Sequence, residues 1–255
     1  MIKNFLQNWS NPFSYMLQNP ELIAMGFATL IFISFCLIIA IRMIYKGIKL
    51  KYYTISNIGV VFIGGATLWS GVALNFLTTL FLNTLPPWEL HFLFHGGFIG
   101  IAIFFWIRGI TSLAQIEKNT RRDIMIISGF VLTVLEILYI AILFTDYTLL
   151  GKPIEPIQVV YQPFSWIYLS ISLGIFLISA AWFVIQTFRS EESKVQLQGK
   201  FLLFAGIFFL IGSILEIFFS EIFILLTARF FITMAVLLGY IGFLMPERVK
   251  KIFLK

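Results

Sequence analysis

Charged residues are scarce in this sequence of 255 residues, of which 12% are Asp, Glu, Lys or Arg and 60% are hydrophobic. Both values lie far outside the range of soluble domains. The strict alternation of apolar and polar residues that marks the strands of a membrane β-barrel is missing as well. Helices are then the spanning structure that can satisfy every backbone group inside a bilayer. The scarcity of charge therefore predicts an integral membrane protein of the all-α class.

The sequence also has a single cysteine, no proline within its long apolar stretches and no recognisable signal peptide. Cys36 is the only cysteine, which excludes an intramolecular disulfide and disfavours a metal site built from thiols. No proline falls within a long apolar stretch, which argues against the broken helices of many ion-coupled transporters. Residues 1–20 contain Asn, Gln and Pro where the apolar core of a signal peptide would lie, so we expect no cleavable signal.

Lysine is absent from residues 201–247, although retinal proteins hold their chromophore through a lysine of the seventh helix. A retinal photoreceptor is therefore excluded, and no retinal cofactor is expected. The Asp-Arg-Tyr and Asn-Pro-x-x-Tyr motifs of the main class of eukaryotic heptahelical receptors are missing too, at residues 106–109 and 239–242. Any analogy to those receptors is limited to helix number and orientation.

Seven apolar stretches are each long enough to cross about 30 Å of hydrocarbon, which takes about 20 helical residues. They cover residues 22–45, 58–82, 90–113, 124–145, 164–188, 201–219 and 222–245. The sequence thus predicts a seven-helix transmembrane domain over residues 22–245, an outer interfacial segment over 1–21 and a basic tail over 246–255. The connections are short, the longest running from about 146 to 162, so none of them holds a soluble domain.

Basic residues lie mostly in alternate connections. Fifteen lysines and arginines fall in the first, third and fifth connections and the tail, whereas the other side has only Lys3 and Lys152. The positive-inside rule then places the N-terminus outside and the C-terminus in the cytoplasm of a multi-pass cell-membrane protein. The same bias accounts for the net charge of +6 through attraction to anionic lipids, so membrane lipids are expected partners and nucleic acid is not.

Polar side chains deep inside the spans are few and gather, at about 1.5 Å of rise per residue, in the outer half of the membrane. They include Asn75, His95, Glu136, Glu216 and Arg229. Arg229 is the only basic residue deep within a span, so we expect Glu136 or Glu216 to form an ion pair with it. A second interpretation is an outward-opening cavity in which Arg229 binds a ligand carboxylate or phosphate. A third is a proton or ion path through these ionisable groups.

His91 and His95 are one helical turn apart, a spacing that can supply two metal ligands from one helix face. The chain resembles the alkaline ceramidase and adiponectin-receptor group of metal-dependent seven-span hydrolases to this extent. Those proteins use three histidines and an aspartate toward the cytoplasm, whereas this chain has two histidines, both predicted near the outer side. We therefore expect an interfacial histidine pair and no metal. Haem held between two helices is disfavoured because both histidines lie on the same helix.

Three residues of the second span match three residues of the sixth span at a constant difference in residue number. The pairs are Gly65 and Gly206, Gly71 and Gly212, and Asn75 and Glu216. Two three-helix repeats joined by a fourth helix resemble the three-plus-one-plus-three bundle of the sugar-transporting SWEET proteins. The resemblance implies a small-solute transporter, although the prolines of the SWEET helices are absent from these spans.

The last span carries Arg229 early and ends in an aromatic-Ile-Gly-Phe sequence at 240–243, followed by Pro246 and the basic tail. With this pattern the chain resembles seven-span archaeal membrane proteins, most clearly in its last three spans. The resemblance implies the heptahelical scaffold and no particular activity.

These features favour a receptor-like or sensor-like membrane protein that binds a small or lipid-like ligand in an outer-half cavity. The residues expected to line the cavity are Asn75, His95, Glu136, Glu216 and Arg229. Two alternatives remain open: a small-solute or lipid transporter that uses the same cavity, and a metal-dependent intramembrane hydrolase centred on His91 and His95. An enzyme is not the favoured interpretation. Since the connections are short, the expected protein partners are a cytoplasmic signalling protein and further copies of the chain.

Overall fold

The structure, a computed structural model, describes residues 11–253, and most of these residues are helical. Its helices are α1 (Pro12–Gln18), α2 (Pro20–Lys49), α3 (Tyr53–Leu82), α4 (Trp88–Gly96), α5 (Ile99–Leu113), α6 (Lys118–Asp146), α7 (Pro163–Phe188), α8 (Ser193–Phe218), α9 (Ile222–Leu244) and α10 (Glu247–Phe253). A 3-10 turn, η1 (Tyr147–Leu149), and two strands, β1 (Gly151–Glu155) and β2 (Gln158–Tyr161), join α6 to α7. The first ten residues of the predicted interfacial segment, and residues 254–255 of the tail, lie outside the described part.

Seven helical segments are long and apolar enough to cross a membrane: α2, α3, α4 with α5, α6 with η1, α7, α8 and α9. Each overlaps one predicted stretch, so the predicted all-α, multi-pass architecture is confirmed. Large apolar side chains cover the outside of the bundle, among them Phe130, Phe144 and Ile178, which are all more than two-thirds exposed. Such a surface is stable in contact with lipid chains and unstable in water.

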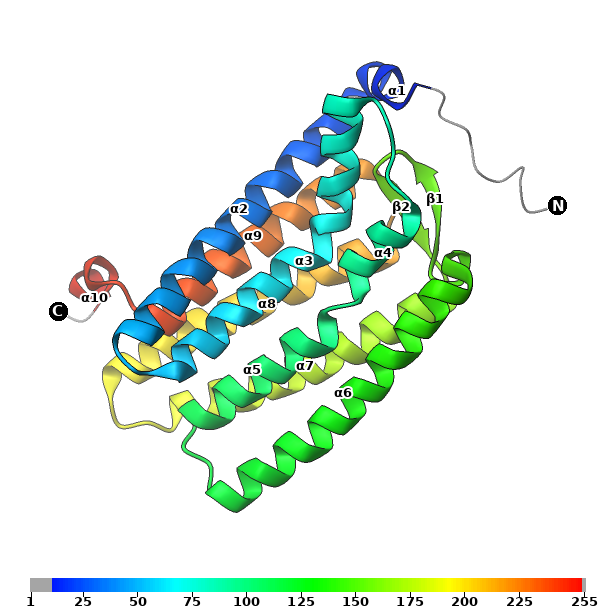
Figure 1. The fold of residues 1–255 in the computed structure, drawn as a ribbon. Coiled ribbons are helices and arrows are strands. Elements are labelled where there is room, and N and C mark those ends of the chain that lie inside the picture. The colour runs from blue at the N-terminus through cyan, green and yellow to red at the C-terminus, as the bar shows by residue number, and fades with distance from the viewer. Residues whose placement is uncertain (1–10, 254–255) are drawn as a thin grey trace.

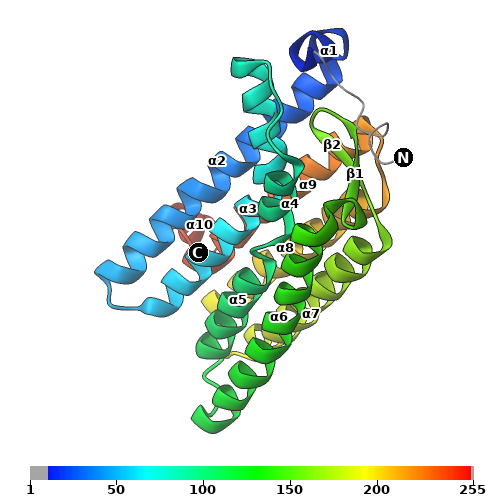
Figure 2. The same cartoon turned by 45° about the vertical axis from the view of Figure 1, so that its right-hand side comes forward.

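Six of the seven spans form a closed ring, and α6 lies outside it (Figures 1 and 2). Around the ring, α2 packs on α3, α3 on α4 and α5, α5 on α7, α7 on α8, α8 on α9, and α9 on α2. Helix α6 packs chiefly on α4 and α5. Its buried residues are Leu132, Tyr139 and Leu143, which form a single stripe. One face of α6 therefore contacts the ring, and the rest of this helix faces outward.

The two ends of the bundle differ in charge. We call one end the basic end, because most of the basic residues lie in α10 and in or beside the three connections at this end, α2 to α3, α5 to α6 and α7 to α8 (Figure 1). We call the opposite end, with α1 and the strands, the hairpin end (Figure 1). The separation of charge that the sequence predicts is thus a separation between two ends of one bundle.

The third span is broken in the middle. The sequence predicts one continuous helix over residues 90–113 and argues against broken helices, and this prediction is wrong. Gly97 and Phe98 have ψ angles of 8° and 3°, far from the helical value of about −42°, so α4 ends and α5 begins around them. Two adjacent glycines, Gly96 and Gly97, weaken the helix at this point. A span can therefore break without proline.

Tyrosines of neighbouring helices bind two carbonyl groups of α4, the Phe92 carbonyl one turn before the break and the Gly96 carbonyl at the break. The Tyr139 hydroxyl, on α6, donates to the Phe92 carbonyl at 2.8 Å, and the Tyr168 hydroxyl, on α7, donates to the Gly96 carbonyl at 3.0 Å. Both tyrosines are buried. Unsatisfied carbonyl groups are costly in hydrocarbon, so these hydrogen bonds stabilise the broken geometry.

The longest connection forms an antiparallel hairpin in which Gly151 pairs with Tyr161. A two-stranded hairpin is marginal by itself, so contacts with the bundle must hold it. Ile157 at its tip is completely buried. The side-chain amide of Asn75 donates to the Pro156 carbonyl at 3.1 Å, and that of Gln158 donates to the Ser220 carbonyl. The hairpin is thus fastened over the ring.

Candidate functional site: a cavity inside the helix ring

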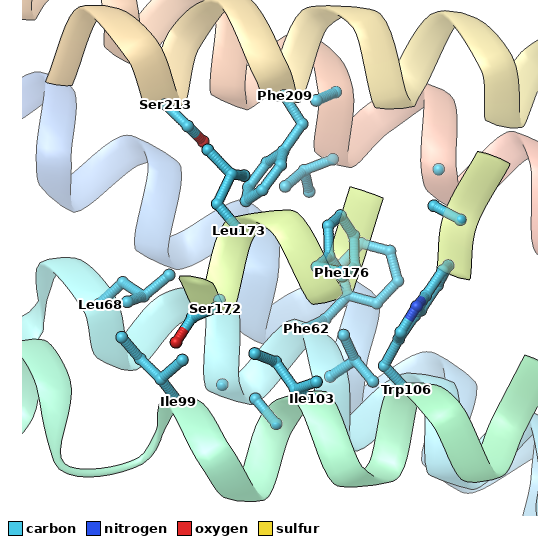
Figure 3. Close-up of a pocket in the computed structure, with 18 of the residues that line it drawn as sticks. Phe62, Leu68, Ile99, Ile103, Trp106, Ser172, Leu173, Phe176, Phe209 and Ser213 are labelled. Atoms are coloured by element: carbon cyan, nitrogen blue, oxygen red, sulfur yellow. The ribbon is translucent and has the colours of Figure 1, made fainter. Parts of the chain in front are cut away.

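A cavity of about 220 Å³ lies inside the ring. Its walls are side chains of α3, α5, α7, α8 and α9, with single contributions from α2, α4 and β2. Figure 3 shows Ile99, Ile103 and Trp106 on the α5 wall and Phe209 and Ser213 on the α8 wall opposite. The three α5 residues are spaced so that they share one helix face, and this face is turned inward.

The cavity is a long tube. Leu202 and Glu216 both line it and are 14 residues apart on α8, which corresponds to a rise of about 21 Å. It runs from Leu202 and Phe243 near the basic end to His95, Tyr161 and Glu216 near the hairpin end. Most of its lining is apolar, and its histidine, tyrosine and glutamate side chains lie at the hairpin end.

A smaller pocket of about 70 Å³ lies under the hairpin, between β2, the end of α8 and the start of α9. It shares Tyr161, Glu216 and Ile217 with the long cavity. These three side chains therefore form the partition between the cavity and the hairpin end.

His95 stands at the hairpin end of the cavity and is 6% exposed. Its Nδ1 lies 2.7 Å from the carbonyl oxygen of Leu68. A carbonyl oxygen can only accept, so Nδ1 carries a hydrogen, and in the neutral imidazole Nε2 is then a hydrogen-bond acceptor. No residue in the described range 11–253 hydrogen-bonds Nε2. The ring of Tyr161 stacks on the imidazole, with centroids 4.9 Å apart.

Arg229 forms the predicted ion pair, and its partner is Glu216. The Arg229 Nη1 and Nη2 atoms donate to the two Glu216 carboxylate oxygens at 2.5 Å and 3.0 Å, in a two-pronged arrangement. Nε donates to the Thr29 hydroxyl at 3.2 Å, and the guanidinium carbon lies 5.1 Å from the centre of the Trp69 ring. With 2% of its side chain exposed, Arg229 is held by α2, α3 and α8 together.

This arrangement bears on the expected anion site. Arg229 does not line the cavity. The N–H groups of its guanidinium that would bind a carboxylate or phosphate already donate to Glu216. A ligand anion would have to displace Glu216 from a buried pair. The geometry thus favours a structural pair over an anion-binding arginine.

Glu136 lies elsewhere, against the break in the third span. One carboxylate oxygen accepts from the backbone N–H of Gly100 at 3.0 Å and lies 3.0 Å from the Tyr168 hydroxyl, whose single hydrogen is shared between this oxygen and the Gly96 carbonyl. Gly100 is in the first turn of α5, where a carboxylate is stabilised by the free N–H groups and the helix dipole. Glu136 does not line the cavity. Its carboxylate instead caps the start of α5. Asn75 does not line the cavity either, because its side chain fastens the hairpin.

The two histidines lie side by side but lack further metal ligands. Their rings are nearly parallel, with centroids 6.4 Å apart, and His91 is 1% exposed. Between residues 11 and 253 no group of three or more His, Cys, Asp or Glu side chains gathers to hold a metal ion. His91 is thus buried inside the bundle.

Of the five predicted site residues, the structure brings His95 and Glu216 to the cavity, pairs Arg229 with Glu216, and places Glu136 and Asn75 outside the lining. Tyr161 is the residue that the sequence analysis misses. Nothing in its local sequence marks it, since the hairpin that carries it to the cavity is a tertiary feature. No protein-family model matches this chain, and no curated protein does either.

Proposed function

We propose that this protein is a receptor-like membrane protein that binds a single hydrocarbon chain inside its helix ring. The observation that carries the proposal is the long apolar cavity, which runs along the helices. Apolar cavities of this size exclude water and take apolar guests. A lining that extends along about 21 Å of helix suits an extended chain better than a compact solute. The ligand chamber is then larger than the outer-half cavity that the sequence predicts.

We place the hairpin end outside the cell, on the strength of the basic residues at the other end. The smaller pocket under the hairpin supports a route for the ligand past Tyr161 and Glu216. Transport of the same kind of ligand is a second candidate function. The broken third span favours it, because discontinuous helices recur at the binding sites of transporters.

Filling the cavity tests the proposal. Gly206 lines the cavity, and a Cβ added at Gly206 meets no heavy atom within 4 Å. Gly206→Leu should therefore occupy the tube without a clash. We expect it to lower the affinity for radiolabelled dodecane by about tenfold or more, since the chain and the leucine compete for one space. Binding is measured by equilibrium dialysis with the purified full-length protein in lipid nanodiscs.

Gly174→Leu provides a matched control. A Cβ at Gly174 also meets no heavy atom within 4 Å, but this residue does not line the cavity. We expect Gly174→Leu to bind dodecane as the parent protein does, and partition into the lipid is the same for both variants. Equal binding by the two leucine variants, or no saturable binding by the parent, would refute the proposal.

A further inference from the structure

The geometry points to a hydroxyl as the head group of the ligand, an inference that rests on the proposed binding of a hydrocarbon chain. We infer that a single hydroxyl sits at the hairpin end of the cavity, donating to Nε2 of His95 and accepting from the hydroxyl of Tyr161. The ligand class is a long-chain alcohol, whose chain fills the apolar tube.

The acceptor is His95. The Leu68 carbonyl, 2.7 Å from Nδ1, holds the imidazole in the form in which Nε2 has a free lone pair. Among residues 11–253, Nε2 has no partner, and the side chain is 94% buried where it lines the cavity. A buried acceptor without a hydrogen bond is costly, so a donor on the ligand is stabilised at this position.

The donor is Tyr161. Its hydroxyl lies 3.5 Å from Nδ1 of His95, and that nitrogen already carries a hydrogen and cannot accept another. The hydroxyl hydrogen is therefore available to a ligand in the cavity that Tyr161 lines. Burial, and secondly the Glu216 carboxylate, raises the pKa of Tyr161 well above its usual value, so the hydroxyl stays protonated.

The two polar groups are adjacent. The phenol and imidazole rings are nearly parallel, with 21° between their planes, so a single small group can reach both. A hydroxyl donates and accepts at once. An ammonium group only donates, and a carboxylate only accepts and would meet the negative charge of Glu216. An ether only accepts, so it would leave Nε2 of His95 without a donor.

Competition against radiolabelled dodecane distinguishes these head groups. In the parent protein we expect dodecan-1-ol to compete about tenfold better than dodecyl methyl ether, and better than dodecylamine and dodecanoate. Tyr161→Phe keeps the stacked ring and removes the hydroxyl, and His95→Leu removes the acceptor. Within each variant, the affinity for dodecan-1-ol relative to that for dodecane should fall, so that most of the preference for the alcohol is lost.

Several results would overturn the inference: equal competition by the alcohol and its methyl ether, tighter binding of the amine or the carboxylate, or a preference for the alcohol that survives in both variants. Tyr161→Phe keeps the test decisive if His95→Leu fails to fold. Saturable binding of dodecane without a preference for the alcohol refutes the head group alone. Absence of dodecane binding by the parent protein refutes the proposed function and, with it, the inference.

Discussion

Replacing Arg229 with alanine is expected to lower the free energy of unfolding by about 3–5 kcal/mol, because Glu216 is left as a buried charge without a partner. The Glu216 side chain is 10% exposed, so water cannot replace the guanidinium. The loss extends to the Thr29 hydroxyl and the face of Trp69, which both contact Arg229. Reversible unfolding of the purified variants in mixed micelles measures the change.

A double-mutant cycle identifies the partner. We expect Arg229→Ala combined with Glu216→Ala to be less destabilising than Arg229→Ala alone, because the second change removes the stranded carboxylate. Glu136→Ala is the control, since Glu136 caps α5 and is not an ion-pair partner of Arg229. Its effect should simply add to that of Arg229→Ala. Additive effects for Glu216 would mean that the ion pair does not stabilise the fold.

Gly96→Ala is expected to destabilise the protein by about 3 kcal/mol, at the upper end of the range for overpacking. A Cβ at Gly96 would overlap the ring of Tyr139 on α6. That ring has no room to retreat, because it is 1% exposed and its hydroxyl is hydrogen-bonded to the Phe92 carbonyl. The substitution therefore separates α6 from the break in the third span. A fall in the midpoint of thermal unfolding is the observable.

Two further variants show whether the clash is the cause. Gly174→Ala places the same methyl group in open space, and we expect no loss of stability, since alanine is the better helix former. Tyr139→Leu combined with Gly96→Ala should recover part of the loss, because the leucine side chain is shorter than the phenol ring. Gly96→Ala with unchanged stability would mean that α4 and α6 are not in contact at this point.

The spans could be predicted because each is recognised from one continuous segment. The ion pair could be predicted because a buried charge needs a partner of opposite charge. A run of about 20 apolar residues identifies a spanning helix by itself. Arg229 must find an acid inside the hydrocarbon, and Glu136 and Glu216 are the only acidic residues within the predicted spans. The choice between Glu136 and Glu216 could not be made, because it depends on which helices are neighbours. The ring places α8 beside α9 and puts α6 outside.

The break, the hairpin and the cavity depend on contacts between distant residues. Gly96 and Gly97 resemble the packing glycines of other spans, and the groups that bind the backbone at the break, Tyr168 and Glu136, come from other helices. The cavity is a space that side chains leave unfilled. Apolar stripes such as that of α5 also occur where helices pack tightly. The pattern alone therefore does not distinguish a helix face that lines a cavity from one that packs against another helix.

A density map of the protein in lipid nanodiscs, prepared without detergent, tests the central claim most directly. We expect elongated density inside the helix ring, running from His95 and Tyr161 at the hairpin end toward Phe243 near the basic end. Collapsed side chains that close the space between α5 and α8, or separate water peaks along it, would contradict the proposal that this ring holds a hydrocarbon chain.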